Sequence, residues 1–445
     1  MHDSLTVSSD KGSILIVGAG TWGTAIAYRL AREGYRHITV LDGQTFPSAT
    51  AAGNDLNKIM EEPEDYPHFD NDNDNDYAWN VIEGLATDVW KSDPIYKPHY
   101  HPTGFIYAAV GDDAYAKVVA TAEAHPANWE ALPDAPFFHS SMPHGVLTGD
   151  FPGWRGFWRK QNAGWVAARQ TMRDLHTECE RLGIQFVFGE KGNVIELSYN
   201  ETRTDVLGAR TADGTQYVAN RTILAAGAGS DMLLNFRKQL RPSAWTLAHI
   251  PLSQEETKIY RDLPVLYCAD RGFFIEPNEG QTEMKICDEH PGYINLLTDT
   301  KLGEQRSRPF SKEQIPLDAE QRMRRLLRET MPQLADRGFS YARVCWDADT
   351  PDRLFLIDQH PEYCSLVVAV GGSGHGFMCS PAVGRLVADL LDGSIEPRLR
   401  RMLQWRPDTA VDRDWYATQG RFGANGKVMS FQDVTGWTNI GRCHL

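Results

Sequence analysis

The stretch SILIVGAGTWGT, residues 13–24, decides the fold. Its first five residues are an apolar run typical of a buried strand, and a glycine-rich turn follows immediately. Apolar residues then recur at helical spacing, and HITVLD, residues 37–42, predicts a second strand. Strand, glycine turn, helix and strand in this order predict the opening unit of a dinucleotide-binding domain.

The three glycines and one acid of this unit have separate expected roles. Gly18 permits the tight turn, Gly20 lets a pyrophosphate approach the backbone, and Gly23 allows close helix–strand packing. Asp42, at the end of the second strand, is placed to accept hydrogen bonds from ribose hydroxyls. The alternative is a glycine turn that binds nothing, but the full context favours a dinucleotide. The motif alone does not separate FAD from NAD.

A second glycine-rich turn near the end of the chain favours a flavin. The segment SLVVAVGGSGHGF, residues 365–377, predicts a strand that enters a tight turn, with a helix starting near Pro381. Main-chain N–H groups of such a turn suit the electron-rich end of a flavin ring, although the same pattern also fits a simple loop. The turn residues expected to bind cofactor are Gly372, Ser373, Gly374, His375 and Gly376.

The order of these patterns predicts two intimately joined domains. Both ends of the chain have α/β character, whereas the middle carries alternating strands. The expected fold is α/β combined with α+β: a discontinuous Rossmann-like FAD-binding domain with an inserted mixed-sheet substrate domain. We assign residues 10–90, 155–235 and 340–400 to the first domain and residues 91–154 and 236–339 to the second. Residues 401–445 are expected to close over the site.

Composition excludes several classes of protein. The 445 residues include 59 acidic and 45 basic ones, and a net charge of -14 argues against nucleic acid or anionic membrane as partners. No run of about 18 apolar residues predicts a membrane span. Seven scattered cysteines favour a reducing compartment over a disulfide framework. No metal site is expected, since His99 and His101 alternate without a third ligand nearby.

Further motifs make a resemblance specific. ILAAGAGS, RVCWDADTPDR, LFLID and SGHGF occur in the order found in monomeric sarcosine oxidase and its relatives. Three other segments resemble the amadoriase branch, the fructosyl amino acid oxidases, in particular: TAAGNDLNKIM (50–60), MKICDEHPGY (284–293) and WRPDTAVDRDW (405–415). The resemblance covers residues 13 to 440.

The resemblance implies FAD as cofactor and gives three residues a role beside it. Cys345 matches the cysteine that bonds to the flavin 8-methyl carbon in that family, whereas without the family it would be a buried structural cysteine. Lys285 matches a lysine beside the flavin, where a fixed ammonium favours oxygen reduction. Lys58 matches a basic residue that stabilises the reduced anionic ring.

The resemblance also implies the substrate contacts and the reaction. Arg413 and Glu289 match positions that hold the amino acid half of a glycated substrate, and Ser373 would lie near its sugar. The implied reaction cleaves the C–N bond of fructosyl amino acids or peptides with oxygen, giving free amino acid, glucosone and hydrogen peroxide. Met378 departs from the pattern, because many relatives have lysine there.

Other readings stay open at this stage. The chain could oxidise another secondary amine, namely sarcosine, pipecolate or saccharopine; Met378 and the segment 405–415 count against these. An NAD-linked dehydrogenase and a non-catalytic flavoprotein are the alternatives from other classes. Relatives are usually monomeric, so a monomer is expected. The final Cys443-His444-Leu445 resembles a relaxed peroxisomal address, which predicts a peroxisomal or otherwise cytoplasmic enzyme.

Overall fold

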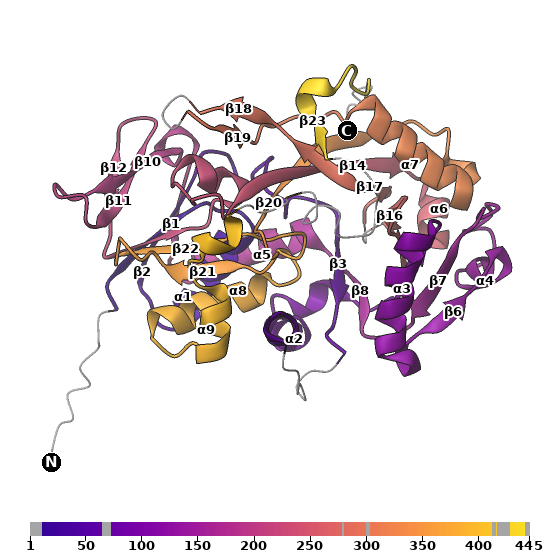
Figure 1. Ribbon diagram of the computed structural model, residues 1–445, viewed down its shortest axis with the longest axis horizontal. Helices are drawn as coiled ribbons and strands as arrows, with labels where there is room; N and C mark the ends of the chain where they lie inside the picture. The colour runs from indigo at the N-terminus through magenta and orange to yellow at the C-terminus, as the bar shows by residue number, and fades with distance from the viewer. Residues whose placement is uncertain are drawn as a thin grey trace, which may run out of the picture.

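The computed structural model describes residues 11–64, 73–277, 280–299, 303–411, 415 and 428–440, without the side chains of residues 289–291. Two large sheets form the frame, and smaller sheets and helices cover them (Figure 1).

The first large sheet is the expected nucleotide-binding one. Its neighbours are parallel except for one antiparallel edge pair, and their order is β21-β22-β13-β1-β2-β9. The carboxyl ends of parallel strands lie at one edge, which is where ligands bind in open α/β sheets. The strands are β1 (Ser13–Val17), β2 (His37–Asp42), β9 (Gln185–Phe188), β13 (Arg221–Leu224), β21 (Leu356–Gln359) and β22 (Leu366–Val370).

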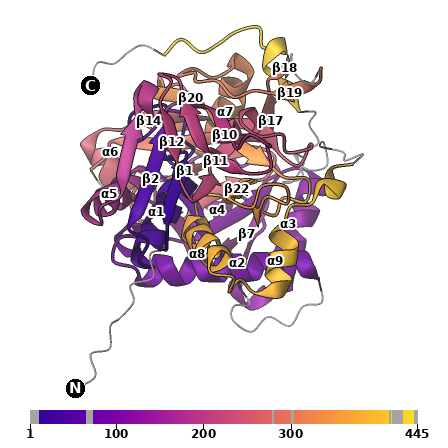
Figure 2. The ribbon, with the colours of Figure 1, turned by 90° about the vertical axis from the view of Figure 1, so that its left-hand side faces the viewer.

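Both faces of this sheet are buried, because alternate side chains of a strand point to opposite faces. Ile14 and Ile16 of β1 lie in a core shared with the helices, whereas Leu15 and Val17 lie in a second core beneath a three-stranded sheet. The helices are α1 (Thr21–Arg32), α2 (Asp74–Ser92), α5 (Ala168–Arg181), α8 (Ser380–Leu391) and α9 (Pro397–Leu403), grouped on one side in Figures 1 and 2. The three strands are β10 (Val194–Tyr199), β11 (Val206–Thr211) and β12 (Gln216–Val218).

The second large sheet is mixed and has nine strands. Helix α7 (Leu317–Thr330) packs against two of its central strands, and α3 (Asp112–Ala124) packs against two others farther along the sheet. The strands are β5 (Phe105–Ala109), β6 (Glu130–Leu132), β7 (Arg155–Arg159), β14 (Arg241–Pro251), β15 (Val265–Cys268), β16 (Gly272–Ile275), β17 (Glu283–Ile294), β20 (Tyr341–Asp349) and β23 (Met429–Ser430).

Smaller elements complete the described part of the chain. A three-stranded sheet consists of β3 (Lys58–Glu61), β8 (Ala163–Val166) and β4 (Tyr100–His101). A short hairpin consists of β18 (Leu296–Thr298) and β19 (Gln305–Ser307). Two short helices are α4 (Ala135–Ser140) and α6 (Gln254–Ile259). Over the described ranges, the helices are all too short or too polar to cross a bilayer.

Two strands at the starts of the expected FAD-binding segments pair in the second large sheet. Residues 155–235 and 340–400 were assigned to the FAD-binding domain, but β7 and β20 at their starts belong to the second large sheet. The reason is long-range pairing: β20 aligns with β14 along nine residue pairs, from Arg241↔Asp349 to His249↔Tyr341. An apolar strand can join either sheet, and only its partner decides. The part of residues 401–445 that is described includes β23, which pairs with β17.

The glycine turn after β1 has the packing that its sequence predicts. Gly18 has φ +106°, and a Cβ there would lie 2.6 Å from the carbonyl oxygen of Ala225. At Gly23 a Cβ would lie 1.7 Å from the carbonyl oxygen of Gly18, so α1 contacts the turn backbone directly. Gly20 differs, since a Cβ there would meet only the Ala51 Cβ, at 3.9 Å. Gly18 and Gly23 are therefore needed for packing, whereas Gly20 keeps space open.

The contact at Gly23 gives the first prediction. Gly23→Ala forces α1 away from the turn, and we expect a loss of about 3 kcal/mol in the free energy of unfolding because overpacked backbone cannot relax easily. Chemical denaturation measures this loss. Gly338→Ala is the matched control, since nothing lies within 4 Å of a Cβ there and φ is not positive. Equal stability of the two variants would contradict the packing role.

Candidate functional site: a cavity between the two sheets

A cavity of about 890 Å³ lies between the two large sheets. Its wall includes the glycine turn, with Gly18, Gly20 and Asp42. It also includes Lys58, Lys285 and Cys345. The cavity therefore brings together most of the residues that the sequence singled out, from segments far apart in the chain.

The glycine turn offers a site for an anion. Helix α1 follows Gly20 without a side-chain cap in the described structure, and its first turn carries no acidic residue. Its first N–H groups and the positive end of its dipole are therefore available to a negative ligand. Asp42 accepts hydrogen bonds from the Ala19 N–H and the Gln44 N–H, both at 3.0 Å, and burial raises its pKa. Its carboxylate thus holds the turn in shape as well as lining the cavity.

The second glycine turn also borders the cavity, through Gly372, Gly374, His375 and Gly376. The structure corrects the expectation for Ser373. Its side chain is wholly buried: the hydroxyl donates to the Gly371 carbonyl and accepts from the Thr350 N–H, both at 3.2 Å. Ser373 has φ +46°, which turns its side chain toward Thr350. It supports the turn instead of contacting a ligand.

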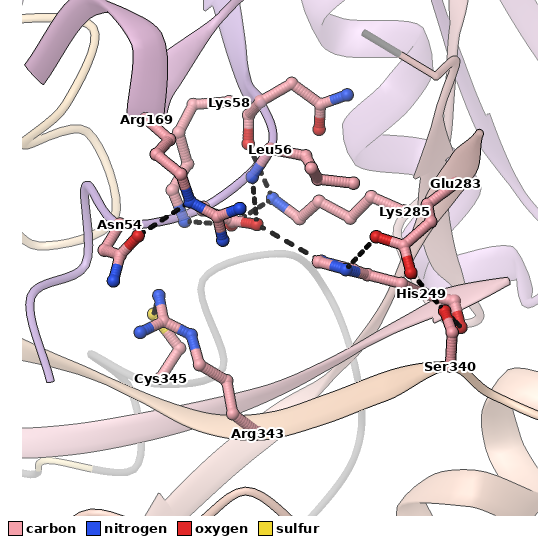
Figure 3. A network of polar contacts seen from close by, with 12 residues as sticks. Asn54, Leu56, Lys58, Arg169, His249, Glu283, Lys285, Ser340, Arg343 and Cys345 are labelled. Carbon is pink, nitrogen blue, oxygen red and sulfur yellow. Dashed lines mark hydrogen bonds and ion pairs between the residues drawn. The ribbon is translucent and has the colours of Figure 1, made fainter. Parts of the chain in front are cut away.

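Two lysines share one buried carboxylate at the cavity (Figure 3). Asp55 Oδ2 lies 2.7 Å from Lys285 Nζ and 2.8 Å from Lys58 Nζ. The Lys285 ammonium also donates to the Asn57 carbonyl at 2.8 Å, and its side chain is only 2% exposed. Lys58 is less enclosed, at 21%. Asp55 thus holds a lysine of β17 and a lysine of β3 against the same cavity.

The charges of this group depend on one another. Burial alone would raise the pKa of Asp55, but the ammonium groups of Lys285 and Lys58 hold it well below its ordinary value. Burial lowers and Asp55 raises the pKa of Lys58, and the net direction is up. Asp55 is therefore an anion and Lys58 a cation across the physiological pH range.

A second layer supports the group from behind. Strand pairing places His249 of β14 directly opposite Lys285. The ring Nε2 of His249 lies 3.8 Å from Asp55 Oδ1, and its Nδ1 lies 3.3 Å from Glu283 Oε2. Ser340 donates to the other oxygen of Glu283 at 2.5 Å. This chain of contacts orients the side chains that face the cavity.

Cys345 lies on the same cavity wall and is half-buried. Two residues earlier on β20, the Arg343 guanidinium is almost wholly buried and lies 3.7 Å from the sulfur. It also donates to the carbonyls of Ala49 and Ala51, at 2.7 and 3.2 Å. Figure 3 shows the guanidinium beside the Cys345 side chain.

The remaining wall near Lys285 is aromatic, and the Lys285 ammonium lies 5.6 Å from the centre of the Phe273 ring. Such walls exclude water and accept the apolar faces of ligands. The aromatic residues of the cavity wall include Phe105, Tyr107, Trp245, Tyr267, Phe273 and Phe310.

Two predicted substrate contacts lie outside the described structure: Arg413, and the side chain of Glu289. Both stay predictions. Met378 lines the cavity at 7% exposure, so the position where many relatives have lysine borders the site. The motifs alone assigned no role to Asp55 or Arg343, although both lie inside the segments used for the resemblance. The signals that could have pointed to them are their charge and their closeness in sequence to Lys58 and Cys345.

Comparison with known proteins now adds to this geometry. Residues 13–390 match the family described as FAD dependent oxidoreductase. The chain belongs to this family, in its amadoriase branch. Fructosyl amine: oxygen oxidoreductase (Amadoriase I) from Aspergillus fumigatus is 50% identical, with 98% of this chain and 99% of that chain covered and a TM-score of 0.92. Fructosamine oxidase (Amadoriase II) from the same organism is 45% identical, with 97% and 98% covered and a TM-score of 0.91.

A more distant relative acts on a different amine. L-saccharopine oxidase of Schizosaccharomyces pombe is 28% identical over 421 residues, which cover 89% of this chain and 93% of the relative. Relatives in this family therefore act on different amines, so family membership alone does not identify the substrate, and the residues of the site have to decide it.

FAD, the cofactor of the family, fits the residues that are present. The uncapped start of α1 and the open space beside Gly20 suit a pyrophosphate. The turn with Gly372 and Gly376, together with Lys285, suits the opposite, electron-rich end. The family match selects FAD over the NAD alternative that the first motif left open.

The shared carboxylate gives the second prediction. Asp55→Asn leaves two ammonium groups without their common counter-charge, and we expect a loss of about 3 kcal/mol or more in the free energy of unfolding. Lys58→Met added to Asp55→Asn should restore part of this loss, since it removes one of the two orphaned charges.

The same variant predicts a pH dependence. Because the folded pKa of Asp55 is lowered, its stabilisation is present above the unfolded pKa and is lost as the pH falls through the folded pKa. The stability difference between wild type and Asp55→Asn should be constant above about pH 5 and shrink below about pH 4. Denaturant titrations over this range measure it, and a difference that grows toward low pH would contradict the charge assignment.

Proposed function

We propose that the chain is an FAD-dependent oxidase of fructosyl amines, cleaving the C–N bond of glycated amino acids or short peptides. The products are the free amino acid, glucosone and hydrogen peroxide. The observation that carries the proposal is Lys285, held by Asp55 against the cavity of a chain 50% identical to Amadoriase I along its whole length.

The described residues would share the work as follows. FAD, when bound, supplies the acceptor for a hydride equivalent and passes the electrons to oxygen. Lys285 places a fixed positive charge where oxygen gains negative charge, and its enclosure keeps that charge undiluted by water. Lys58 contributes a second fixed cation at the cavity wall. The aromatic wall holds the substrate and excludes water.

Three finer points belong to the proposal. Arg413 would bind the substrate carboxylate in a two-pronged contact and Glu289 would face the amino acid half. Cys345 would bond covalently to the flavin. The enzyme would act as a monomer, and the peroxisomal address is a proposal that rests on residues 443–445 alone, outside the described structure.

The competing substrates are other secondary amines. Among them, saccharopine has the support of a relative, the L-saccharopine oxidase. Met378 argues against small amino acids such as sarcosine, because a thioether at the cavity cannot pair with a carboxylate.

A direct assay separates these candidates. We expect peroxide formation with fructosyl-valine or ε-fructosyl-lysine under air, at a kcat/KM at least 100-fold above that for sarcosine, pipecolate or saccharopine. Coupled peroxide detection with the purified yellow protein measures it. Turnover of saccharopine with inert fructosyl amines would overturn the proposed substrate while leaving the flavin chemistry intact.

Lys285 gives a prediction on rate. In Lys285→Met the reoxidation of reduced enzyme by oxygen should slow by about 100-fold or more, since one preorganised charge is lost. Stopped-flow mixing of the anaerobically reduced protein with oxygenated buffer isolates this step. Lys58→Met is the comparison, since it removes the neighbouring cation and leaves the Lys285–Asp55 pair. Unchanged reoxidation in Lys285→Met would contradict the role.

A further inference from the structure

We infer that Arg343 assists the formation of the bond between Cys345 and the flavin by stabilising negative charge on the cysteine sulfur as it attacks. The inference rests on the proposed covalent attachment and concerns the residue that promotes it.

The geometry places a guanidinium at the sulfur by a local rule of strand structure. Residues two apart on a strand face the same side, so Arg343 and Cys345 of β20 both face the cavity side of the sheet. A guanidinium nitrogen of Arg343 lies 3.7 Å from Cys345 Sγ, within hydrogen-bond range of sulfur. The bonds to Ala49 and Ala51 fix the guanidinium in that position.

The charge balance of Arg343 is unusual. The side chain is 2% exposed, yet its bonds to Ala49 and Ala51 are to neutral carbonyls. Within the described ranges, its guanidinium makes no ion pair within 4 Å with a carboxylate. A buried cation without an adjoining anion is costly, and any negative charge that develops at contact distance relieves this cost. The atom at contact distance is the Cys345 sulfur.

The other charged groups around the sulfur are already engaged. Lys58 of β3 acts on the sulfur electrostatically, but its ammonium is paired with Asp55. Asp347, two residues farther along β20, accepts hydrogen bonds from the N–H groups of Gly374 and Ala348. On the neighbouring strand β14, the residue opposite Cys345 is the uncharged Trp245. Arg343 is thus the cation within hydrogen-bond range of the sulfur, and the carboxylate that acts on it from a distance, Asp55, is already paired with the two lysines.

The step balances with oxygen as oxidant. The Cys345 thiol and the 8-methyl group of the flavin each give up one proton, and an S–C bond forms between them. Two electrons and these two protons remain on the ring system, and molecular oxygen then removes both as hydrogen peroxide. The thiolate is the nucleophile in such chemistry, so a cation that stabilises it speeds the attack.

The test compares Arg343→Met, Arg343→Lys and Cys345→Ser with wild type. Each protein is purified with its flavin after a short expression, and acid precipitation separates covalent from released flavin. The Arg343→Met protein and wild-type apoprotein from riboflavin-limited cells are then incubated with added FAD between pH 6.5 and 9.5, and flavin fluorescence in denaturing gels follows bond formation in both with time. Arg169→Met is the matched control, because Arg169 is an arginine near the same loop whose side chain donates to Asn54.

We expect wild type and Arg169→Met to hold their flavin in the precipitate. Arg343→Met should release most of it and form the bond at least 10-fold more slowly at pH 7. Its rate should rise as the pH increases, because the thiolate is the nucleophile, and Arg343→Lys should recover part of the rate. A merely structural role for Arg343 would give no such pH recovery.

The outcomes separate the two proposals. Wild-type flavin released by acid would refute the covalent attachment itself, whatever Arg343 does. Covalent flavin in wild type, with an equal and pH-independent rate in Arg343→Met, would overturn the role of Arg343 alone. An Arg343→Met protein that binds FAD but stays slow at every pH would also overturn it, because the loss would then be one of positioning.

Discussion

The position of the two lysines at the cavity depends on one buried carboxylate, that of Asp55. Asp55 is wholly enclosed, and it lies within 2.8 Å of lysines that come from two different sheets. Burying a charge is costly unless a charge of opposite sign lies beside it, and here one carboxylate is the partner of both lysines. The ion pair between Asp55 and Lys285 also joins the loop before β3 to β17. The contacts that stabilise the buried charges therefore also fix the position of this loop relative to β17 at the cavity.

The placement of cations follows from this arrangement. Lys285 and Lys58 line the cavity, Arg343 lies beside Cys345 of its wall, and the uncapped helix α1 presents positive charge at another part of the wall. Both ends of a bound FAD that carry or gain negative charge would therefore meet fixed positive charge. Preorganised charge of this kind stabilises a developing anion without reorganisation, which is the main contribution a protein can make when the cofactor does the redox chemistry.

What could be predicted from sequence was local. The turn with Gly18, Gly20 and Gly23 is defined by contacts within a few residues, so its spacing predicts its shape. The membership of β7 and β20 depends on partner strands far along the chain, which composition does not reveal. Ser373 was expected to bind a ligand, but a left-handed backbone turned it inward, and a turn sequence alone does not give the direction of one hydroxyl. The role of Asp55 depends on its contact with Lys285, which lies far away in the sequence, so the sequence did not predict it.

The central claim is that the cavity holds FAD with its ring system between Cys345 and Lys285. A crystal structure of the yellow protein, at a resolution that resolves single side chains, tests it most directly. The account predicts the pyrophosphate at the start of α1, the ring bounded by Lys285 on one side, and continuous density from its 8-methyl carbon to Cys345 Sγ. A ring bound elsewhere, or one turned so that Cys345 and Lys285 both lie away from it, would contradict the account.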